Sequence, residues 1–132
     1  VASLTAKYWA TPLNEEIAWT PLDTQVINQE VAKGNVVFVD VTADWCVTCK
    51  ANKIGVLLQD PVYSKLQQQN VIAMKGDWTV PSESVTTYLQ SFDRYGVPFN
   101  IVYGPAAPNG IELSTILNSD DVIDALKQAK GQ

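Results

Sequence analysis

The sequence contains no histidine. This absence excludes Ser-His-Asp and Cys-His nucleophile arrangements, metal sites with histidine ligands, and acid-base catalysis by an imidazole. Any chemistry carried out by this chain must therefore use thiols, carboxylates, amines or phenols.

Positive charge is also scarce. Nine Lys and Arg residues face 14 Asp and Glu residues, which gives a net charge of -5 at pH 7, and no basic stripe or cluster occurs. Binding to nucleic acid or to anionic lipid therefore lacks its main driving force, and we expect neither as a partner.

Long apolar runs are missing as well. No stretch approaches the roughly 20 apolar residues that a membrane-spanning helix needs. The N-terminus, Val1-Ala2-Ser3-Leu4, has neither an initiator methionine nor the pattern of a signal peptide. We therefore expect a mature or excised piece, with any targeting sequence or membrane span of a parent protein lying outside these residues.

The remaining composition is typical of one globular domain. The chain has 132 residues, of which 46% are hydrophobic and 17% charged, with seven glycines and seven prolines. These values exclude collagen-like, coiled-coil and disordered classes, and the length supports one core. Residues 1–16 are polar and irregular, so we interpret them as a linker or N-terminal arm that precedes a domain over residues 17–132.

Hydrophobic periodicity predicts alternating strands and helices along this domain. Residues 36–41 are almost entirely apolar and β-branched, as in a central strand that is buried on both faces. The predicted elements are a strand at 17–20, a helix at 21–34, a strand at 36–41, a helix at 46–59, a helical turn at 60–67, a strand at 71–75, a helix at 82–95, a strand at 97–103, a loop at 104–110, a strand at 111–113, and a helix at 119–130 capped by Ser119 or Asp120. This order predicts an α/β fold in which a mixed β-sheet is flanked by helices on both faces.

Cys46 and Cys49 are the only cysteines, and their spacing allows three interpretations. A structural disulfide would close a ring of about four residues and contribute only roughly 2 kcal/mol, which makes this a poor position for a stabilising crosslink. A zinc site would need further ligands, and without histidine only scattered carboxylates could supply them. A Cys-x-x-Cys pair close to a β-α-β pattern favours a redox motif.

The redox interpretation also has a physical basis. A thiolate at the start of a helix is stabilised by unpaired backbone N–H groups and by the positive end of the helix dipole. Cys46, at the start of the predicted helix, is therefore the expected attacking nucleophile. Cys49 lies one turn further along and is placed to resolve a mixed disulfide formed on Cys46.

Asp40 is the one charged residue in an otherwise apolar strand, six residues before Cys46. It could lie at the end of the strand and reach solvent. The alternative, which we favour, is a buried carboxylate beneath the motif with a raised pKa, which accepts the proton of Cys49 during exchange.

The segment from Phe38 to Lys50 resembles the active-site segment of thioredoxins. Asp40 matches the buried aspartate of that family, Trp45 matches the tryptophan before the first cysteine, and Gly96-Val97-Pro98 matches its Gly-x-Pro loop. The run Asp44–Lys50, together with Gly76–Thr79 and Tyr95–Pro98, is more particular. It resembles the C-terminal periplasmic domain of the DsbD-type membrane reductases, and within them the ScsB-like branch that is linked to copper tolerance.

This resemblance implies a thioredoxin-like fold and several site residues. It implies a cis peptide bond before Pro98, backbone at Val97 that pairs with an extended segment of a substrate, and a place for Trp45 in the substrate-binding surface. It further implies a reductase that receives electrons from a transmembrane cysteine pair of its own parent protein and passes them to periplasmic thiol-disulfide proteins. The cysteines themselves are the redox centre, so no organic cofactor and no metal is expected.

Two points leave alternatives open. DsbD-type domains have a second acidic residue four positions after the second cysteine, whereas this chain has Lys53. Lys53 either favours a nearby thiolate, leaving Asp40 to act alone, or is a solvated helix residue. The functional alternative to an oxidoreductase is a module in which Cys46 and Cys49 bind Cu(I), an ion that soft thiolates select.

Overall fold

The computed structural model describes residues 16–132, and the predicted arm, apart from Glu16, lies outside the described residues. The elements along the chain are β1 (Thr20–Pro21), α2 (Thr24–Ala32), β2 (Val36–Thr42), α3 (Val47–Asn52), the π-helix η1 (Lys53–Leu57), α4 (Val62–Leu66), β3 (Val71–Asp77), α5 (Glu83–Gln90), β4 (Phe99–Gly104), β5 (Ala107–Glu112) and α6 (Ser119–Lys130).

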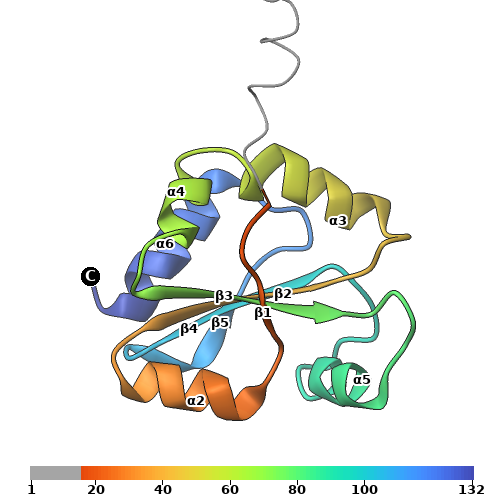
Figure 1. Cartoon of the computed structure of the whole chain (residues 1–132), viewed down its shortest axis with the longest axis horizontal. Coiled ribbons are helices and arrows are strands. Elements are labelled where there is room, and N and C mark those ends of the chain that lie inside the picture. Colours follow the sequence, from red (N-terminus) through yellow and green to blue (C-terminus); the bar gives the residue numbers. More distant parts are fainter. Residues whose placement is uncertain (1–15) are drawn as a thin grey trace, which may run out of the picture.

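The five strands form one mixed sheet in the order β1-β3-β2-β4-β5. β1 and β2 each pair in parallel with β3, whereas β4 is antiparallel to β2 and β5 is antiparallel to β4. Helices α2 and α5 lie on one face of this sheet, and α3, α4 and α6 lie on the other (Figure 1). The predicted α/β fold with helices on both faces is therefore confirmed.

Strand β2 lies at the centre of the sheet and is buried along nearly its whole length. Because successive side chains of a strand point to opposite faces, β2 supplies both cores. Val37, Val39 and Val41 belong to the core beneath α2 and α5. Val36 and Phe38 belong to the core beneath α4 and α6. The continuous apolar pattern thus reflects burial on both faces, as the sequence predicts.

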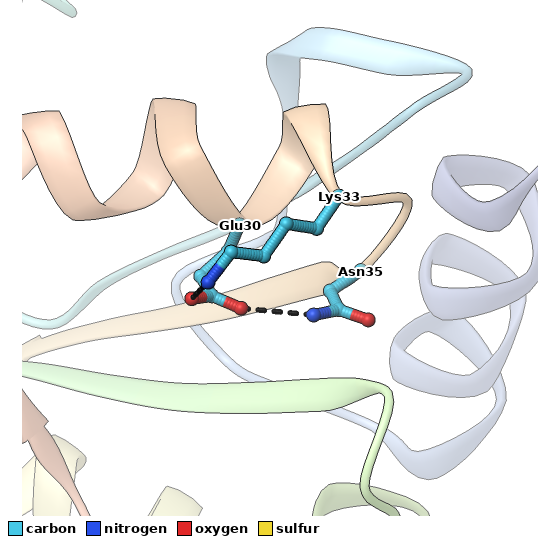
Figure 2. Close-up of polar contacts among 3 residues, drawn as sticks. All are labelled: Glu30, Lys33 and Asn35. Carbon is cyan, nitrogen blue, oxygen red and sulfur yellow. Dashed lines mark hydrogen bonds and ion pairs between the residues drawn. The ribbon is translucent and has the colours of Figure 1, made fainter.

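Helix α2 shows how the sequence fixes one connection into this strand. Asp23 caps its N-terminus by accepting hydrogen bonds from the backbone N–H groups of the first turn. At its C-terminus, Glu30 accepts a hydrogen bond from Asn35 at 2.8 Å and forms an ion pair with Lys33 at 3.3 Å (Figure 2). Gly34, with φ 92°, forms the turn that connects the end of α2 to β2.

Three predicted boundaries are wrong in instructive ways. The helix predicted over 46–59 changes at Lys53 into the π-helix η1, which the apolar periodicity does not indicate. The helix predicted to reach Arg94 or Tyr95 ends at Gln90, and a turn with a positive φ at Asp93 follows it. The cap of α6 is Asn118, whose side chain accepts from the backbone N–H of Asp121, rather than Ser119 or Asp120.

The predicted loop over 104–110 is largely strand. β5 begins at Ala107 and includes Pro108 and Gly110, residues that usually mark turns. It is an edge strand, so the missing N–H of proline need not break a central ladder, and its pairing with β4 contains an irregularity. Residues 76 and 77, which follow the strand predicted over 71–75, likewise belong to strand β3.

Helix α6 closes the sheet from the end of the chain. Its residues Val122, Ala125 and Ala129 are buried in the same core as Phe38. A Cβ on Gly104 would overlap the backbone carbonyl of Ala129, so glycine is needed for this close approach of helix and strand. Within the described part of the chain, no helix is long and apolar enough to cross a membrane.

Candidate functional site

Cys46 and Cys49 lie at the start of α3, shortly after the end of β2. Cys46 is the N-cap of α3, and its Sγ accepts a hydrogen bond from the backbone N–H of Cys49 at 3.1 Å. The two residues form a disulfide with a Cα–Cα distance of 5.2 Å. Hydrogen bonding of a backbone N–H to Sγ favours the charged form of a thiol, so this geometry suits a thiolate on Cys46 in the reduced state.

The disulfide is packed rather than open to solvent. Each cysteine is 6% exposed, and together with Ala43 they form a small apolar cluster that Val97 covers. The peptide bond between Val97 and Pro98 is cis, as the family resemblance implies. The loop before β4 is thus placed against the disulfide, and Val97 lies beside both sulfur-bearing residues.

Asp40 is buried, at 9% exposed, on the face of β2 opposite Val39 and Val41. Asn100 of β4 donates a hydrogen bond to its Oδ1 at 2.8 Å, and Lys75 of β3 is its neighbour in the sheet register. Burial raises the pKa of Asp40 to about 6, and the Asn100 hydrogen bond and the charges of Lys75 and Lys53 oppose that rise. The carboxyl group therefore changes charge close to neutral pH.

A cavity of about 100 Å³ joins Asp40 to the second cysteine. The cavity is lined by Glu16, Trp19, Asp40, Thr42, Ala43, Asp44, Cys49, Lys50, Lys53 and Lys75. A larger hollow of about 270 Å³ lies between α4 and α6 and is lined by Val36, Lys65, Gln68, Asn70, Val71, Ile123, Leu126, Lys127, Lys130 and Gln132. It holds neither cysteine nor Asp40, so we place the site at the smaller cavity, which brings a thiol and a titratable carboxyl together.

Trp45 is 58% exposed next to the disulfide, yet its indole is held in place. Its Nε1 donates a hydrogen bond to the carbonyl oxygen of Thr79 at 2.9 Å, and its ring lies 6.4 Å from that of Trp78. The hydroxyl of Thr79 also accepts from the backbone N–H of Asp44 at 2.9 Å. An apolar side chain is thereby presented to solvent in one orientation beside Cys46.

Several site residues are not identified by the sequence patterns. Thr79 lies in a segment whose sequence indicates only a turn. In the structure this segment follows β3, and the hydroxyl and carbonyl oxygens of Thr79 hold the Asp44–Trp45 segment. Trp19, to which the sequence patterns assign no role, packs against Phe38 and lines the cavity. Trp9 lies outside the described residues.

Lys53 lines the same cavity and forms an ion pair with Glu16. Its side chain is partly exposed, and its charge lowers the pKa of Asp40. An effect of Lys53 on a cysteine thiolate stays a prediction. Glu16 could not be identified from the sequence, because nothing in its local pattern predicts a contact with a residue 37 positions along the chain.

Two residues of the predicted set are thus brought directly together: Cys49 lies with Asp40 at the cavity. Val97 and Cys46 lie on the side of the disulfide that the cis-proline loop covers, and Trp45 borders it. Within residues 16–132, no group of three or more His, Cys, Asp or Glu side chains is placed to hold a metal ion.

A family profile described as thioredoxin-like matches residues 19–105. The chain belongs to the thioredoxin-like family. Comparison with curated proteins found no match. The match to the thioredoxin-like family includes the Cys46–Cys49 pair, Asp40 and Pro98, and a thioredoxin-like domain with a Cys-x-x-Cys disulfide indicates thiol-disulfide oxidoreductase chemistry.

Solved structures agree with this family. The reduced form of the DsbD c-terminal domain from Neisseria meningitidis is similar with a TM-score of 0.62 and 20% identity, over 83% of this chain and 99% of that one. Its oxidised form gives 0.62 and 19%, over 80% and 90%. A thioredoxin from Thermus thermophilus gives 0.64 and 18%, over 86% and 87%. At these identities the likeness shows the thioredoxin-like fold.

Proposed function

We propose that this domain is a protein-disulfide reductase that works by dithiol-disulfide exchange through Cys46 and Cys49. The observation that carries the proposal is the Cys46–Cys49 disulfide at the start of α3, with its second cysteine on the same cavity as the buried Asp40. Two thiols carry two electrons, so this chemistry requires no organic cofactor and no metal.

The first step forms a mixed disulfide. In the reduced domain, the Cys46 thiolate attacks one sulfur of a partner disulfide, an S–S bond forms between Cys46 and the partner, and the other partner sulfur leaves as a thiolate. The hydrogen bond from the Cys49 N–H to the Cys46 sulfur stabilises the attacking thiolate. Val97 packs against the cysteine pair. Together with Trp45 and Pro98 it forms the proposed contact surface for the partner segment.

The second step releases the partner. Cys49 gives its proton to the Asp40 carboxylate and attacks the Cys46 sulfur, which re-forms the intramolecular disulfide and expels the second partner sulfur as a thiolate. The partner gains two electrons and Cys46 and Cys49 lose two. A carboxyl group whose pKa is raised to about 6 is mostly ionised at pH 7 and yet a competent proton acceptor.

The proposed partners follow the DsbD-type resemblance. A transmembrane cysteine pair of the same parent protein donates electrons to the domain, and oxidised periplasmic thiol-disulfide proteins accept them, so the domain, proposed to span residues 17–132 after a linker over 1–16, resides in the periplasm as part of an inner-membrane protein. The likeness to the DsbD c-terminal domain supports this assignment. The ScsB-like branch and its connection with copper tolerance rest on the sequence motifs around Cys46 and Pro98.

The reduction potential of the Cys46–Cys49 pair tests the direction of electron flow. The domain is equilibrated in defined thiol-disulfide buffers, free thiols are trapped by alkylation, and the products are counted by mass. A value between about -200 and -270 mV, or below, supports an electron donor, whereas a value near -120 mV would make the domain an oxidant.

Two cysteine variants test the roles of the thiols. Cys46→Ser is expected to abolish exchange with a disulfide substrate, while Cys49→Ser is expected to accumulate a mixed disulfide on Cys46 that is visible by mass. A domain that fails to exchange and instead binds Cu(I) tightly through both thiols would replace the reductase proposal with a copper-binding module.

A further inference from the structure

Charged side chains from several different elements line the cavity beside Asp40. Asp40 comes from β2, and two of the lysines come from helical turns and one from the neighbouring strand. The charged and titratable groups that face the cavity are Lys50 and Cys49 of α3, Lys53 of η1, Lys75 of β3, Asp44 after β2, and Glu16 before β1. Asn100 of β4 completes the surroundings of Asp40 as a neutral hydrogen-bond donor.

Lys53 is directed to this cavity by its place on the helix. It follows Cys49 by four residues, which puts the two side chains on the same face one turn apart. The preceding residue, Asn52, holds the helix at this rotation, because its side chain donates to the carbonyl oxygen of Thr115 at 2.9 Å and accepts from the backbone N–H of Leu117 at 3.1 Å. The Lys53 side chain thus lines the same cavity as Asp40.

Glu16 supplies the opposite charge from a distant part of the sequence. It forms an ion pair with Lys53 and lines the same cavity. A positive charge near a buried carboxyl group favours its ionised form, and a negative charge disfavours it. Lys53 lowers the pKa of Asp40, and Glu16 is placed to oppose that effect, because it lines the same cavity and pairs with the Lys53 ammonium group.

We propose that Lys53 and Glu16 are a pair of positioning residues that set the charge state of Asp40, and through it the step in which Cys49 resolves the mixed disulfide. The second half of this inference rests on the proposed function. The first half does not, because it concerns only the ionisation of a buried carboxyl group. Glu16, which precedes β1 in the chain, thereby adjusts the ionisation of the proposed proton acceptor, Asp40.

The titration of Asp40 tests the charge effect without any assay of activity. The side-chain carboxyl carbon of Asp40 is followed by NMR against pH in the oxidised domain, in which the cysteines do not titrate. Lys53→Gln is expected to shift the midpoint to higher pH, since it removes a positive charge. Glu16→Gln is expected to shift it to lower pH, and the double variant should return close to the wild-type midpoint.

Lys50→Gln is the matched control for Lys53→Gln. It removes the same charge from a side chain that lines the same cavity, whereas the ion pair with Glu16 is made by Lys53, whose charge lowers the pKa of Asp40. The proposal is overturned if Lys53→Gln shifts the midpoint no more than Lys50→Gln does, or if Lys53→Gln and Glu16→Gln shift it in the same direction.

The resolving step is measured separately. Cys46 is loaded with glutathione as a mixed disulfide, and the release of glutathione by Cys49 is followed against pH in the same variants. The pH profile should move in the same sense as the Asp40 midpoint. If the midpoints move as expected and the release profiles do not, the link to Cys49 is wrong. If the wild-type domain fails to release glutathione, the proposed function fails while the titration still decides the charge effect.

Discussion

The face of the sheet beneath α2 and α5 is apolar along the length of β2, whereas the opposite face changes from apolar to charged at one residue. On the first face, β2 contributes Val37, Val39 and Val41. On the second it contributes Val36 and Phe38, and then Asp40, which lines a cavity together with Cys49 of α3. The same strand therefore carries packing on one side and a titratable group on the other, because neighbouring residues point to opposite faces.

The difference between the two faces shows that a carboxyl group is buried where polar and charged partners surround it. Asp40 has a hydrogen bond from Asn100 and two lysines whose charges favour its ionised form. The core that contains Val39 is mostly hydrocarbon and has no charged member, and the hydroxyl groups of its Tyr88 and Tyr103 are hydrogen-bonded to each other. Burial of an unpaired charge costs several kcal/mol, so the two faces should respond in opposite ways to the same side chain.

The most severe test moves the carboxyl group across the sheet. Val39→Asp is expected to lower the free energy of unfolding by about 3–5 kcal/mol, because it buries a charge with no partner. Urea unfolding followed by tryptophan fluorescence measures this loss, with Val39→Thr as a control of nearly the same shape and no charge. A Val39→Asp domain as stable as the Val39→Thr domain would contradict the contrast between the faces.

The complementary change neutralises the carboxyl group that is already there. The pKa of Asp40 is raised to about 6 in the folded domain, so the folded state binds more protons than the unfolded state between about pH 4 and pH 6. Stability of the wild type therefore falls as pH rises through this range, and the loss is complete above pH 6.

Asp40→Asn should remove that loss. At pH 7 the variant is expected to be more stable than the wild type by about 3 kcal/mol, since one pKa unit corresponds to about 1.4 kcal/mol. At pH 4 the two should be close to equal. Urea unfolding of the oxidised proteins at both pH values measures the difference, and a stability gap that does not depend on pH would exclude titration of Asp40 as its cause.

A smaller effect is expected at the exposed edge of the site. Trp45→Ala should raise the KM for a protein disulfide about tenfold, or about 1.4 kcal/mol, and leave the stability nearly unchanged, because the side chain is 58% exposed. Ile116→Ala is the control, since Ile116 is also an exposed apolar residue, at 67%, beyond the far end of α3. Equal changes in KM for both variants would argue against a specific contact by Trp45.

The smallest effect is expected on the packing side, at the end of α2. Hydrogen bonding by Asn35 and then by Lys33 holds the pKa of Glu30 below its usual value. Glu30→Gln should lower stability by about 0.5 kcal/mol at pH 7, and less as pH falls and the wild-type carboxylate is protonated. Thermal unfolding at pH 7 and pH 4 measures this change, and the rate of disulfide exchange should stay the same.

Much of the fold could be predicted because its signals are local. The apolar run of β2 and the cysteine spacing each depend on residues that are close in sequence. The buried position of Asp40 was also predictable, since its neighbours on both sides in the sequence are apolar and carry the strand into the core. The match of Gly96-Val97-Pro98 to a known loop predicted a cis bond that composition alone would not indicate.

The parts that were not predicted depend on distant residues. β5 is a strand because β4 pairs with it, despite Pro108 and Gly110 in its sequence. The orientation of Trp45 depends on Thr79, and the charges at the cavity depend on Glu16. Each of these contacts joins segments more than 30 residues apart or opposes local preference, so periodicity and spacing contain no signal for it.

Helix α6 has a consequence for the order in which the protein is made. The cysteines precede α6 by about 70 residues, and this helix completes the core that contains Phe38 of β2. At roughly 5–20 residues per second, synthesis leaves both thiols without their finished fold for several seconds. Because residues 1–132 contain only two cysteines, oxidation within this part of the chain during that interval can produce one pairing alone, which is the native one.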